Sequence, residues 1–508
     1  MEVLEQKTRV DQFDPELHRS LWARVCRQIA IARASLGLPP EMENAYQHIS
    51  YRISECLAWS EPVLEKYDVI IIGAGTAGCL AATTASKAGL RTLMIDRKDR
   101  PDIGRKVCGD AVGKHHFDHL GLKEPTGDQL ERIMEGVRIF SPDMQTTFDV
   151  RGEGLNGFLL NRHMFGQRLL ENAIDSGASL KDFTQALEPI IENRYVTGVA
   201  TKNLKTETTT RLSSRVLIDA SGFPAVVRKK LPEEMGIDAE VKNEDAEACY
   251  REIRELKEPI ENPDLCQIYL TQKVCPGGYY WIFQKSGSKV NVGLGVAMTK
   301  NFPNPKELLY KFVLTKSVFK DSKLVEGGTW YVPTRRPLDS MVGNGIIIIG
   351  DAACQVNPVH GGGIGPSMKG GTIAGKTMIE ALEKDDVSRE TLWGYNVDYM
   401  ETYGLKQAGL DVFRKLLQES DDQELSFGMA YKLITEEDLL QTSLGREVKL
   451  SISDKALRAF RGIRKFSFLQ KLRERIKQMN KARELYRNYP ASPEGFEDWK
   501  RKTEKLFA

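Results

Sequence analysis

Short apolar runs that end at glycines or acids dominate the first half of the chain. Residues 67–72 (YDVIII) are nearly all apolar, which predicts a buried strand. The small and apolar residues that follow predict a helix through Ala88, and residues 91–95 predict a second strand ending at Asp96. A strand, a helix and a strand in this order predict a βαβ unit with a parallel sheet, so the predicted fold class is α/β.

Further apolar runs extend this pattern along the chain. Residues 215–219 (RVLID) predict a strand ending at Asp219, and residues 345–351 (GIIIIGD) predict a strand ending at Asp351. Strand-like pieces within 137–150 and 266–298 predict a mostly antiparallel second sheet. From about residue 386 the pattern is helical and charged.

These patterns predict a discontinuous nucleotide-binding domain, a second domain with an antiparallel sheet, and helical segments at both ends. The N-terminal extension is predicted to be helical, and the sequence assigns no role to it. The predicted ranges are 65–125, 155–240 and 331–385 for the nucleotide domain, 126–154 and 241–330 for the second domain, 1–64 for the extension, and 386–508 for the helical C-terminal region.

The loop after the first strand carries the glycine spacing of a dinucleotide site. Gly73, Gly75 and Gly78 form G-x-G-x-x-G between a strand and a helix. The first glycine allows the tight turn, the second lets the backbone approach a pyrophosphate, and the third lets helix and strand pack closely. Asp96, at the end of the second strand, is predicted to accept hydrogen bonds from both ribose hydroxyls.

A second glycine-rich stretch, GDAACQVNPVHGGGIGPSMKGG, spans residues 350–371. Four of the five residues from 361 to 365 are glycines, and a helix is predicted to follow. A tight turn needs only one or two glycines, so a flat ring that approaches the backbone is the preferred explanation. The positive end of the helix dipole would suit the negative charge of a reduced flavin.

Composition and charge exclude several classes of protein. The 508 residues are 41% hydrophobic and 28% charged, and the formal net charge of +2 gives no sign of nucleic-acid binding. The eight cysteines show no C-x-x-C pair and no zinc-ligand spacing, which argues against disulfides and a metal site. No apolar run reaches the roughly 18 residues of a membrane span, so a cytoplasmic protein is expected, with peripheral contact at the inner face of the cell membrane.

The strand-terminal aspartate followed by a glycine-rich helix resembles the arrangement in glutathione-reductase-type flavoproteins. There the aspartate bonds the ribityl chain, and the helix N-terminus faces the pyrimidine edge of the flavin. The resemblance implies a Rossmann-like FAD domain of the glutathione-reductase and p-hydroxybenzoate-hydroxylase type, joined to an antiparallel-sheet substrate domain. Together with the dinucleotide motif and the narrower resemblance described next, it implies that FAD contacts Gly73, Gly75, Gly78, Asp96, Arg97, Lys106, Cys108, Gly109, Arg162, Asp219, Gly350, Asp351, Gly361, Gly362, Gly363 and Ile364.

Three separated motifs narrow the resemblance. GRKVCGDAVG (104–113) contains K-x-C-G, CPGGYYWIFQKSG (275–287) contains P-x-x-Y-x-W-x-F, and NPVHGGGIG spans 357–365. Over residues 65–400 the chain resembles the geranylgeranyl reductase family of FAD-dependent oxidoreductases, of the archaeal digeranylgeranylglycerophospholipid reductase type. Gln284 stands where that family commonly has proline, and the first 60 or so residues have no counterpart in its usual members.

The aromatic motif predicts a wall for an apolar substrate. In a strand, Tyr279, Trp281 and Phe283 point to one face, and the residues between them point to the other. With Pro276 of the same motif, these are the expected substrate-binding residues. The alternative is that the rings fill the core of a sheet.

Alkene reduction by hydride transfer also needs an acid, because an isolated alkene is a poor hydride acceptor. Cys108 is the preferred proton donor, and His360 and Tyr279 are rivals. The alternative for Cys108 is a small buried hydrophobe. His115 and His116 are expected on a helix surface.

The segment 454–487 holds twelve Lys and Arg residues against three acids, with apolar residues at steps of three and four. This pattern predicts a basic amphipathic helix or helix pair. Such a helix can lie on an anionic membrane, or its apolar stripe can pack on the domain. No nucleic-acid motif accompanies the charge.

The sequence therefore predicts an FAD-dependent enzyme that reduces geranylgeranyl chains in ether-lipid precursors. NAD(P)H or a small iron–sulfur protein such as ferredoxin would supply electrons, and no second dinucleotide motif is present in the sequence. The alternatives are an aromatic-hydroxylase-type monooxygenase, a reductase of geranylgeranyl diphosphate, chlorophyll or quinone side chains, and a non-enzymatic lipid-binding protein.

Overall fold

A computed structural model describes residues 65–443 and 463–508 of the chain. Residues 63–508 form one compact unit. The predicted N-terminal extension and the first part of the predicted basic segment, up to residue 462, lie outside the described residues.

The first sheet has eight strands and a parallel centre, as the βαβ pattern predicts. β1 (Lys66–Ile72) pairs in parallel with β2 (Thr92–Ile95) and with β11 (Thr209–Asp219). The isoleucines at 70, 71 and 346–348 are fully buried, as expected of strands covered on both faces. The other strands are β8 (Ser179–Lys181), β9 (Thr184–Glu192), β10 (Tyr195–Asn203), β17 (Val342–Gly343) and β18 (Ile346–Ile348), and the path through the sheet runs β17-β18-β11-β1-β2-β8, with β10 pairing β11 and β9.

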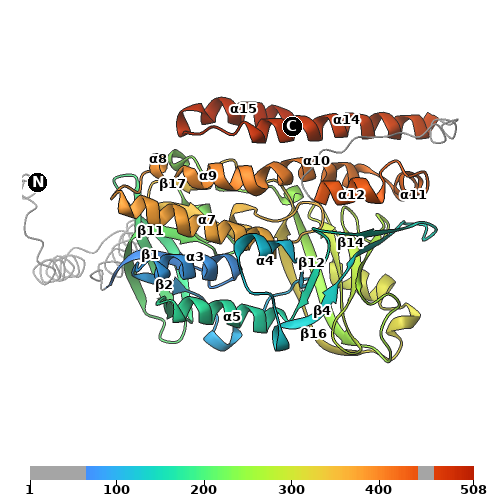
Figure 1. Ribbon diagram of the computed structural model, residues 1–508, viewed down its shortest axis with the longest axis horizontal. Helices are drawn as coiled ribbons and strands as arrows, with labels where there is room; N and C mark the ends of the chain where they lie inside the picture. Colours follow the sequence, from blue (N-terminus) through green and yellow to red (C-terminus); the bar gives the residue numbers. More distant parts are fainter. Residues whose placement is uncertain (1–64, 444–462) are drawn as a thin grey trace, which may run out of the picture. The chain divides into compact units, whose positions relative to one another are not determined.

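Three helices surround the turn that follows β1. α3 (Thr76–Lys87) packs against both α5 (Arg162–Asp175) and α7 (Ile364–Glu383). Small residues at these contacts allow the close packing, since a Cβ on Gly371 of α7 would lie 2.2 Å from the Ala77 carbonyl oxygen (Figure 1). The N-termini of α3 and α7 are thereby held at the carboxyl ends of β1 and β18.

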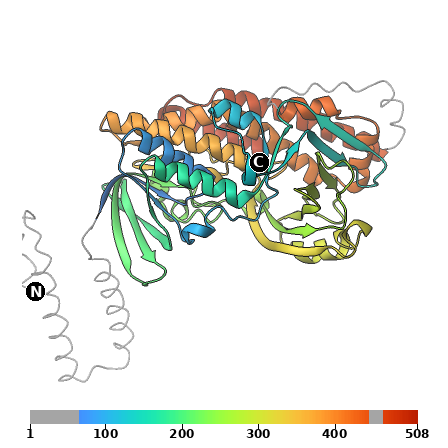
Figure 2. The same ribbon diagram turned by 60° about the horizontal axis from the view of Figure 1, so that its bottom comes forward.

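The second sheet has seven strands in the order β16-β12-β15-β14-β13-β5-β6. Its pairs are antiparallel except for β13 with β5, so the mostly antiparallel prediction is confirmed. Figure 2 shows it on the far side of the unit from the green hairpin β9–β10. Its strands are β5 (Gly136–Phe140), β6 (Thr147–Arg151), β12 (Ala246–Glu255), β13 (Leu265–Leu270), β14 (Tyr279–Gln284), β15 (Lys289–Ala297) and β16 (Lys323–Pro333).

A small sheet and a layer of helices complete the unit. The small sheet consists of β3 (Ala111–Gly113), β7 (Gly157–Leu160) and β4 (Leu130–Met134). The remaining helices are α4 (His115–Leu120), α6 (Pro305–Leu308), α8 (Arg389–Leu392), α9 (Gly394–Tyr399), α10 (Leu405–Glu419), α11 (Asp422–Ala430), α12 (Glu436–Ser443), α14 (Ile463–Arg487) and α15 (Phe496–Phe507).

The apolar stripe of the basic C-terminal helix packs on the protein. α14 lies along α10, and Leu469, Leu472, Ile476 and Met479 are buried (Figure 1). Of the two roles predicted for the stripe, docking on the domain is therefore confirmed. Within the described ranges, no helix is long and apolar enough to cross a membrane.

The predicted strand over 345–351 is wrong at its end. β18 stops at Ile348, and residues Gly350–Ala353 form a 3-10 turn that begins with φ +65° at Gly350. The left-handed conformation turns the chain away from the sheet, which only glycine tolerates readily. Asp351 consequently lies in a turn beyond the sheet.

Candidate active site

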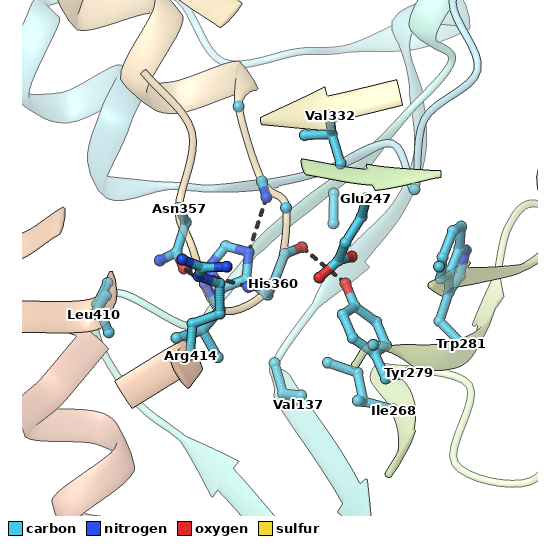
Figure 3. Close-up of a pocket in the computed structure, with 18 of the residues that line it drawn as sticks. Val137, Glu247, Ile268, Tyr279, Trp281, Val332, Asn357, His360, Leu410 and Arg414 are labelled. Carbon is cyan, nitrogen blue, oxygen red and sulfur yellow. Dashed lines mark hydrogen bonds between the residues drawn. The ribbon is translucent and has the colours of Figure 1, made fainter. Parts of the chain in front are cut away.

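A cavity of about 510 Å³ lies between the glycine-rich turns of the first sheet, the face of the second sheet and the helices α10 to α12. Figure 3 shows the part of it between the His360 loop and β14. One end is lined by main chain and charged groups near α3 and α7. The other end is lined by aromatic and aliphatic side chains.

The three glycines of the first turn have different reasons to be glycine. A Cβ on Gly73, where φ is +101°, would lie 2.4 Å from the Ala220 carbonyl oxygen, and one on Gly78 would lie 2.0 Å from the Gly73 carbonyl oxygen. Protein packing therefore explains these two. Gly75 lines the cavity and has nothing within 4 Å of its Cβ position. A ligand that approaches the main chain explains this glycine, as the dinucleotide motif predicts.

Arg162 brings unsatisfied positive charge to the same end of the cavity. It begins α5, is 8% exposed, and its Nη2 donates to Thr76 Oγ1 at 2.6 Å. Its Nε and Nη1 are buried without a partner in the described parts of the chain. A buried guanidinium with unused donors is costly, so an anionic ligand next to Thr76 would satisfy it. The residues at this end thus fit a dinucleotide phosphate.

The two predicted cofactor aspartates differ in position. Asp96 accepts hydrogen bonds from the main-chain N–H groups of Ala74 and Lys98, both at 2.9 Å, and braces the first turn outside the cavity lining. Asp351 lines the cavity, and its Oδ2 pairs with Lys106 Nζ at 2.7 Å. Lys106, one of the predicted cofactor contacts, is therefore ion-paired within the protein.

The second glycine loop closes on itself before α7 begins. Asn357 Oδ1 accepts from the N–H of Val359 at 2.9 Å, and the Gly361 N–H donates to the Asn357 carbonyl at 2.9 Å. Gly361 has φ +65°, and Gly361, Gly362, Gly363 and Ile364 all line the cavity. Gly365 has a different reason to be glycine, since a Cβ there would lie 2.0 Å from His116 Nε2.

The loop that carries Cys108 is fixed by buried polar contacts from the second sheet. Asn291 Nδ2 donates to the Cys108 carbonyl at 2.8 Å and to Asp110 Oδ2 at 2.9 Å. Lys285 Nζ pairs with the same Asp110 oxygen at 2.9 Å, and Arg251 Nη2 donates to the Lys106 carbonyl at 3.0 Å. Burial raises the pKa of the Cys108 thiol, so Cys108 faces the cavity as a neutral thiol.

The three rings predicted to form an aromatic wall lie on one face of β14. Tyr279, Trp281 and Phe283 line the cavity, whereas Tyr280 and Ile282 belong to the core on the other face of β14. Trp281 Nε1 donates to Asn291 Oδ1 at 2.9 Å, which ties the wall to the Cys108 loop. The Tyr279 hydroxyl donates to the His360 carbonyl at 2.7 Å and joins β14 to the glycine loop (Figure 3).

His115, His116 and His360 all line the cavity. His360 extends into it, and its Nδ1 accepts the Gly362 N–H at 3.2 Å. The prediction that His115 and His116 lie on a helix surface is wrong, because α4 packs on α7 and turns both rings into the cavity. Burial lowers the pKa of His115 and of His360 to about 4 and that of His116 well below its usual range.

Glu247 of β12 is a cavity residue that no sequence motif indicated. It is 5% exposed and lines the apolar end of the cavity, and its carboxylate is drawn beside Tyr279 and Val332 in Figure 3. Burial raises the pKa of its carboxyl to about 7. The sequence gives no local signal for it, because β12 also contains Glu252 and Glu255, and the face that carries Glu247 also carries Arg251.

Besides Gly73, Gly78 and Asp96, three further predicted site residues do not reach the cavity lining. Asp219 is fully buried, and its carboxylate accepts the N–H groups of Ser221, Val227 and Arg228, which shapes the turn after β11. Pro276 lies beside the lining residue Gly277, and its carbonyl accepts the Ala297 N–H at 3.0 Å. Arg97 is exposed beyond Asp96.

Two family models match the parts of the chain that form the two ends of the cavity. Residues 245–332 match the model described as geranylgeranyl reductase catalytic domain, and residues 68–223 match glucose inhibited division protein A. The first match covers β12 to β16, which carry Glu247 and the aromatic wall. The second covers the dinucleotide turn.

Known proteins resemble the chain over most of its length. Digeranylgeranylglycerophospholipid reductase of Sulfolobus acidocaldarius is 43% identical, over 87% of this chain and 97% of the relative. A geranylgeranyl bacteriochlorophyll reductase-like protein from Thermoplasma acidophilum shares the fold with a TM-score of 0.68 at 24% identity, over 82% of this chain and 99% of that protein. The flavin-dependent brominase Bmp2 follows with a TM-score of 0.58 at 18% identity, over 81% and 100%.

The identity and coverage of the Sulfolobus relative, together with the catalytic-domain match over the aromatic wall, settle the family. The Rossmann-type first sheet and the antiparallel second sheet agree with the fold implied by the three sequence motifs. This chain belongs to the geranylgeranyl reductase family.

Proposed function

We propose that this protein is an FAD-dependent reductase that hydrogenates the carbon–carbon double bonds of geranylgeranyl chains carried by a glycerophospholipid. The observation that carries the proposal is one continuous cavity with two chemically different ends. A phosphate-binding end with spare donors is joined to an apolar end with an aromatic wall. The name and 43% identity of the Sulfolobus relative support this substrate class.

Two independent observations, the open space at Gly75 and the unused donors of Arg162, support FAD at the polar end of the cavity, near α3 and α7. The space above Gly75 would be filled by a side chain, and the unused donors of Arg162 need an anion. Arg162, Thr76 and the main chain of Gly75 would hold the pyrophosphate, and Asp351 with residues 361–364 would hold the flavin side. When bound and reduced, FAD supplies a hydride.

The apolar end suits a prenyl chain. Trp281, Tyr279 and Phe283 form one wall, and side chains of α10, α11, α12 and α14, among them Leu410 and Leu472, line the other. Moving a prenyl chain from water into such a cavity gains roughly 25 cal/mol per Å² of apolar surface. Cys108, His360 and Tyr279 line the same cavity and are the sequence candidates for handing a proton to a lipid bound there.

The source of electrons and the route of the lipid are part of the proposal. NAD(P)H or ferredoxin reduces the bound flavin. Docking of the α14 stripe leaves Arg473, Lys477 and Lys481 exposed, and these cations support peripheral contact with an anionic membrane surface.

The test is an anaerobic turnover with purified full-length protein. Its visible spectrum reports bound flavin, dithionite reduces the flavin, and a geranylgeranyl glycerophospholipid is then added. We expect reoxidation of the flavin together with a lipid mass gain of two hydrogen atoms for each reduced bond. A flavin that reoxidises only with oxygen, while the lipid mass stays constant, would replace the proposal with the monooxygenase alternative.

A further inference from the structure

We propose that Glu247 is the acid that protonates the alkene in the reaction proposed above. The inference rests on that proposed reductase function and adds a residue that none of the sequence motifs contains. The step needs an acid at the substrate because hydride addition to one alkene carbon leaves the other carbon short of a proton.

The fold directs Glu247 into the substrate end of the cavity. In β12 it pairs with Ala297 of β15 on one side and with Val332 of β16 on the other. A Cβ on Gly295 would lie 3.0 Å from Glu247 Oε2, so glycine at this position leaves room for the carboxyl. The side chain therefore reaches across β15 toward Tyr279 of the aromatic wall (Figure 3).

The carboxyl is buried but unpaired. In the described ranges, 65–443 and 463–508, it makes no hydrogen bond and no ion pair, whereas its oxygens are open to the cavity. A buried carboxyl without a partner is normally avoided. A ligand or proton-transfer role accounts for it, and the neighbouring surface is apolar.

Most of the groups that face Glu247 are neutral. Tyr279 of β14, Cys249 of β12 and Cys275 before β14 are neutral, because burial raises the pKa of each. Arg414 of α10 is the nearby cation, but its guanidinium is paired with Asp411 at 2.7 Å and Asp245 at 2.8 Å. Burial outweighs the attraction of Arg414 and holds the Glu247 pKa at about 7.

The other candidate donors are weaker acids in this structure. The Tyr279 proton is committed to the His360 carbonyl, and burial raises the pKa of its hydroxyl well above the usual range. Burial also raises the pKa of the Cys108 thiol. His360 is neutral at pH 7 because burial lowers its pKa to about 4, and neutral imidazole is a poor proton donor.

The step balances in atoms and electrons. Bound reduced FAD would supply the hydride for one alkene carbon, and the O–H bond of Glu247 would break as a C–H bond forms at the other. The electron pair of the O–H bond stays on the carboxylate, which regains a proton from water before the next turnover. A carboxyl with a pKa near neutrality can be reloaded at physiological pH, which suits repeated reduction of several double bonds.

The experiment compares Glu247→Gln, Glu247→Asp and Cys108→Ser in the FAD-loaded full-length protein. The comparison variant is Glu252→Gln, because Glu252 is fully buried in the same strand outside the cavity lining, where it bonds Tyr250 and Tyr310 and pairs with Arg254. Because the change removes this ion pair, thermal unfolding checks that the variant is folded. For Glu247→Gln we expect about a 100-fold or greater loss of alkene reduction, with bound FAD and lipid affinity unchanged. Glu252→Gln should retain most of the turnover, and Cys108→Ser tests whether the thiol rather than the carboxyl supplies the proton.

Two further readouts keep the proposal falsifiable. Turnover of the wild type should fall as pH rises through about 7, since the acid must be protonated, and Glu247→Asp should keep this limb with lower turnover. Infrared difference spectra between low and high pH, recorded without substrate, should show a buried protonated carboxyl that Glu247→Gln lacks.

The outcomes separate the two proposals. If the wild type leaves the lipid unreduced, the reductase function fails. If the wild type reduces the lipid and Glu247→Gln does so equally well, Glu247 is not the acid. A sharp loss in Cys108→Ser with normal Glu247→Gln turnover would assign the proton to the thiol instead.

Discussion

The two ends of the cavity are built in different ways. At the polar end, called here the dinucleotide end, two short turns, residues 73–78 and 357–365, present main-chain atoms at the starts of α3 and α7. The apolar end is called the lipid end. At the lipid end, single side chains from distant strands and helices meet, such as Glu247, Tyr279 and Leu410. The dinucleotide end depends on backbone geometry and the lipid end on side-chain packing. Substitutions at the two ends should therefore affect folding, FAD binding and lipid binding to different degrees.

The largest effect is expected where packing and backbone geometry coincide, at Gly73. Gly73→Ala forces a Cβ to within 2.4 Å of a carbonyl oxygen at φ +101°. We expect a destabilisation of more than about 5 kcal/mol, seen as loss of soluble folded protein. Thermal unfolding followed by circular dichroism measures it.

Gly75→Ala is the matched control for this end. Nothing lies within 4 Å of its Cβ position, so the variant should fold like the wild type and lose only flavin. Equal FAD content in Gly75→Ala and wild type, by absorbance after gel filtration, would show that no cofactor approaches this main chain.

A packing defect is expected next, at the lipid end. Trp281→Ala removes a ring that is 7% exposed and leaves Asn291 without its donor. We expect about 3–5 kcal/mol lower stability and weaker lipid binding, while FAD stays bound. Chemical denaturation and lipid titration measure the two effects. If Trp281→Ala binds lipid as tightly as the wild type, the aromatic side chains serve core packing and not substrate binding.

The difference between the ends also determines what could be predicted from the sequence. The turn around Gly75 is contiguous, and alternate residues of one strand share a face, so the dinucleotide turn and the side of β14 that carries Trp281 could be predicted. Glu247 reaches Tyr279 only because β15 lies between β12 and β14, and no local pattern fixes that strand order. His116 was misplaced because α7 packs on α4, a contact far apart in sequence.

Charge at the dinucleotide end should give an intermediate effect. Arg162→Met keeps an unbranched apolar stem but removes the guanidinium, with its two unused donors and its bond to Thr76. We expect FAD to bind about 10 to 100 times more weakly, because charge-assisted hydrogen bonds contribute roughly 1.5–3 kcal/mol. Fluorescence titration of the apoprotein with FAD measures the affinity. The FAD affinity of Arg162→Lys, which keeps the charge, should lie between those of the wild type and Arg162→Met. Unchanged affinity in both variants would exclude Arg162 from the phosphate site.

The smallest effect is expected where the two ends touch, at the Tyr279 hydroxyl. Tyr279→Phe keeps the ring in the wall and removes one hydrogen bond to the His360 carbonyl. A neutral hydrogen bond contributes about 1 kcal/mol to the free energy of unfolding, so we expect a loss of stability of about that size. Turnover should fall by less than about tenfold. FAD and lipid should both still bind, because neither the Gly75 turn nor the position of Trp281 depends on this bond. A loss of turnover as large as that of Glu247→Gln would mean that the Tyr279 hydroxyl itself transfers the proton. The catalytic acid would then lie where the dinucleotide end meets the lipid end.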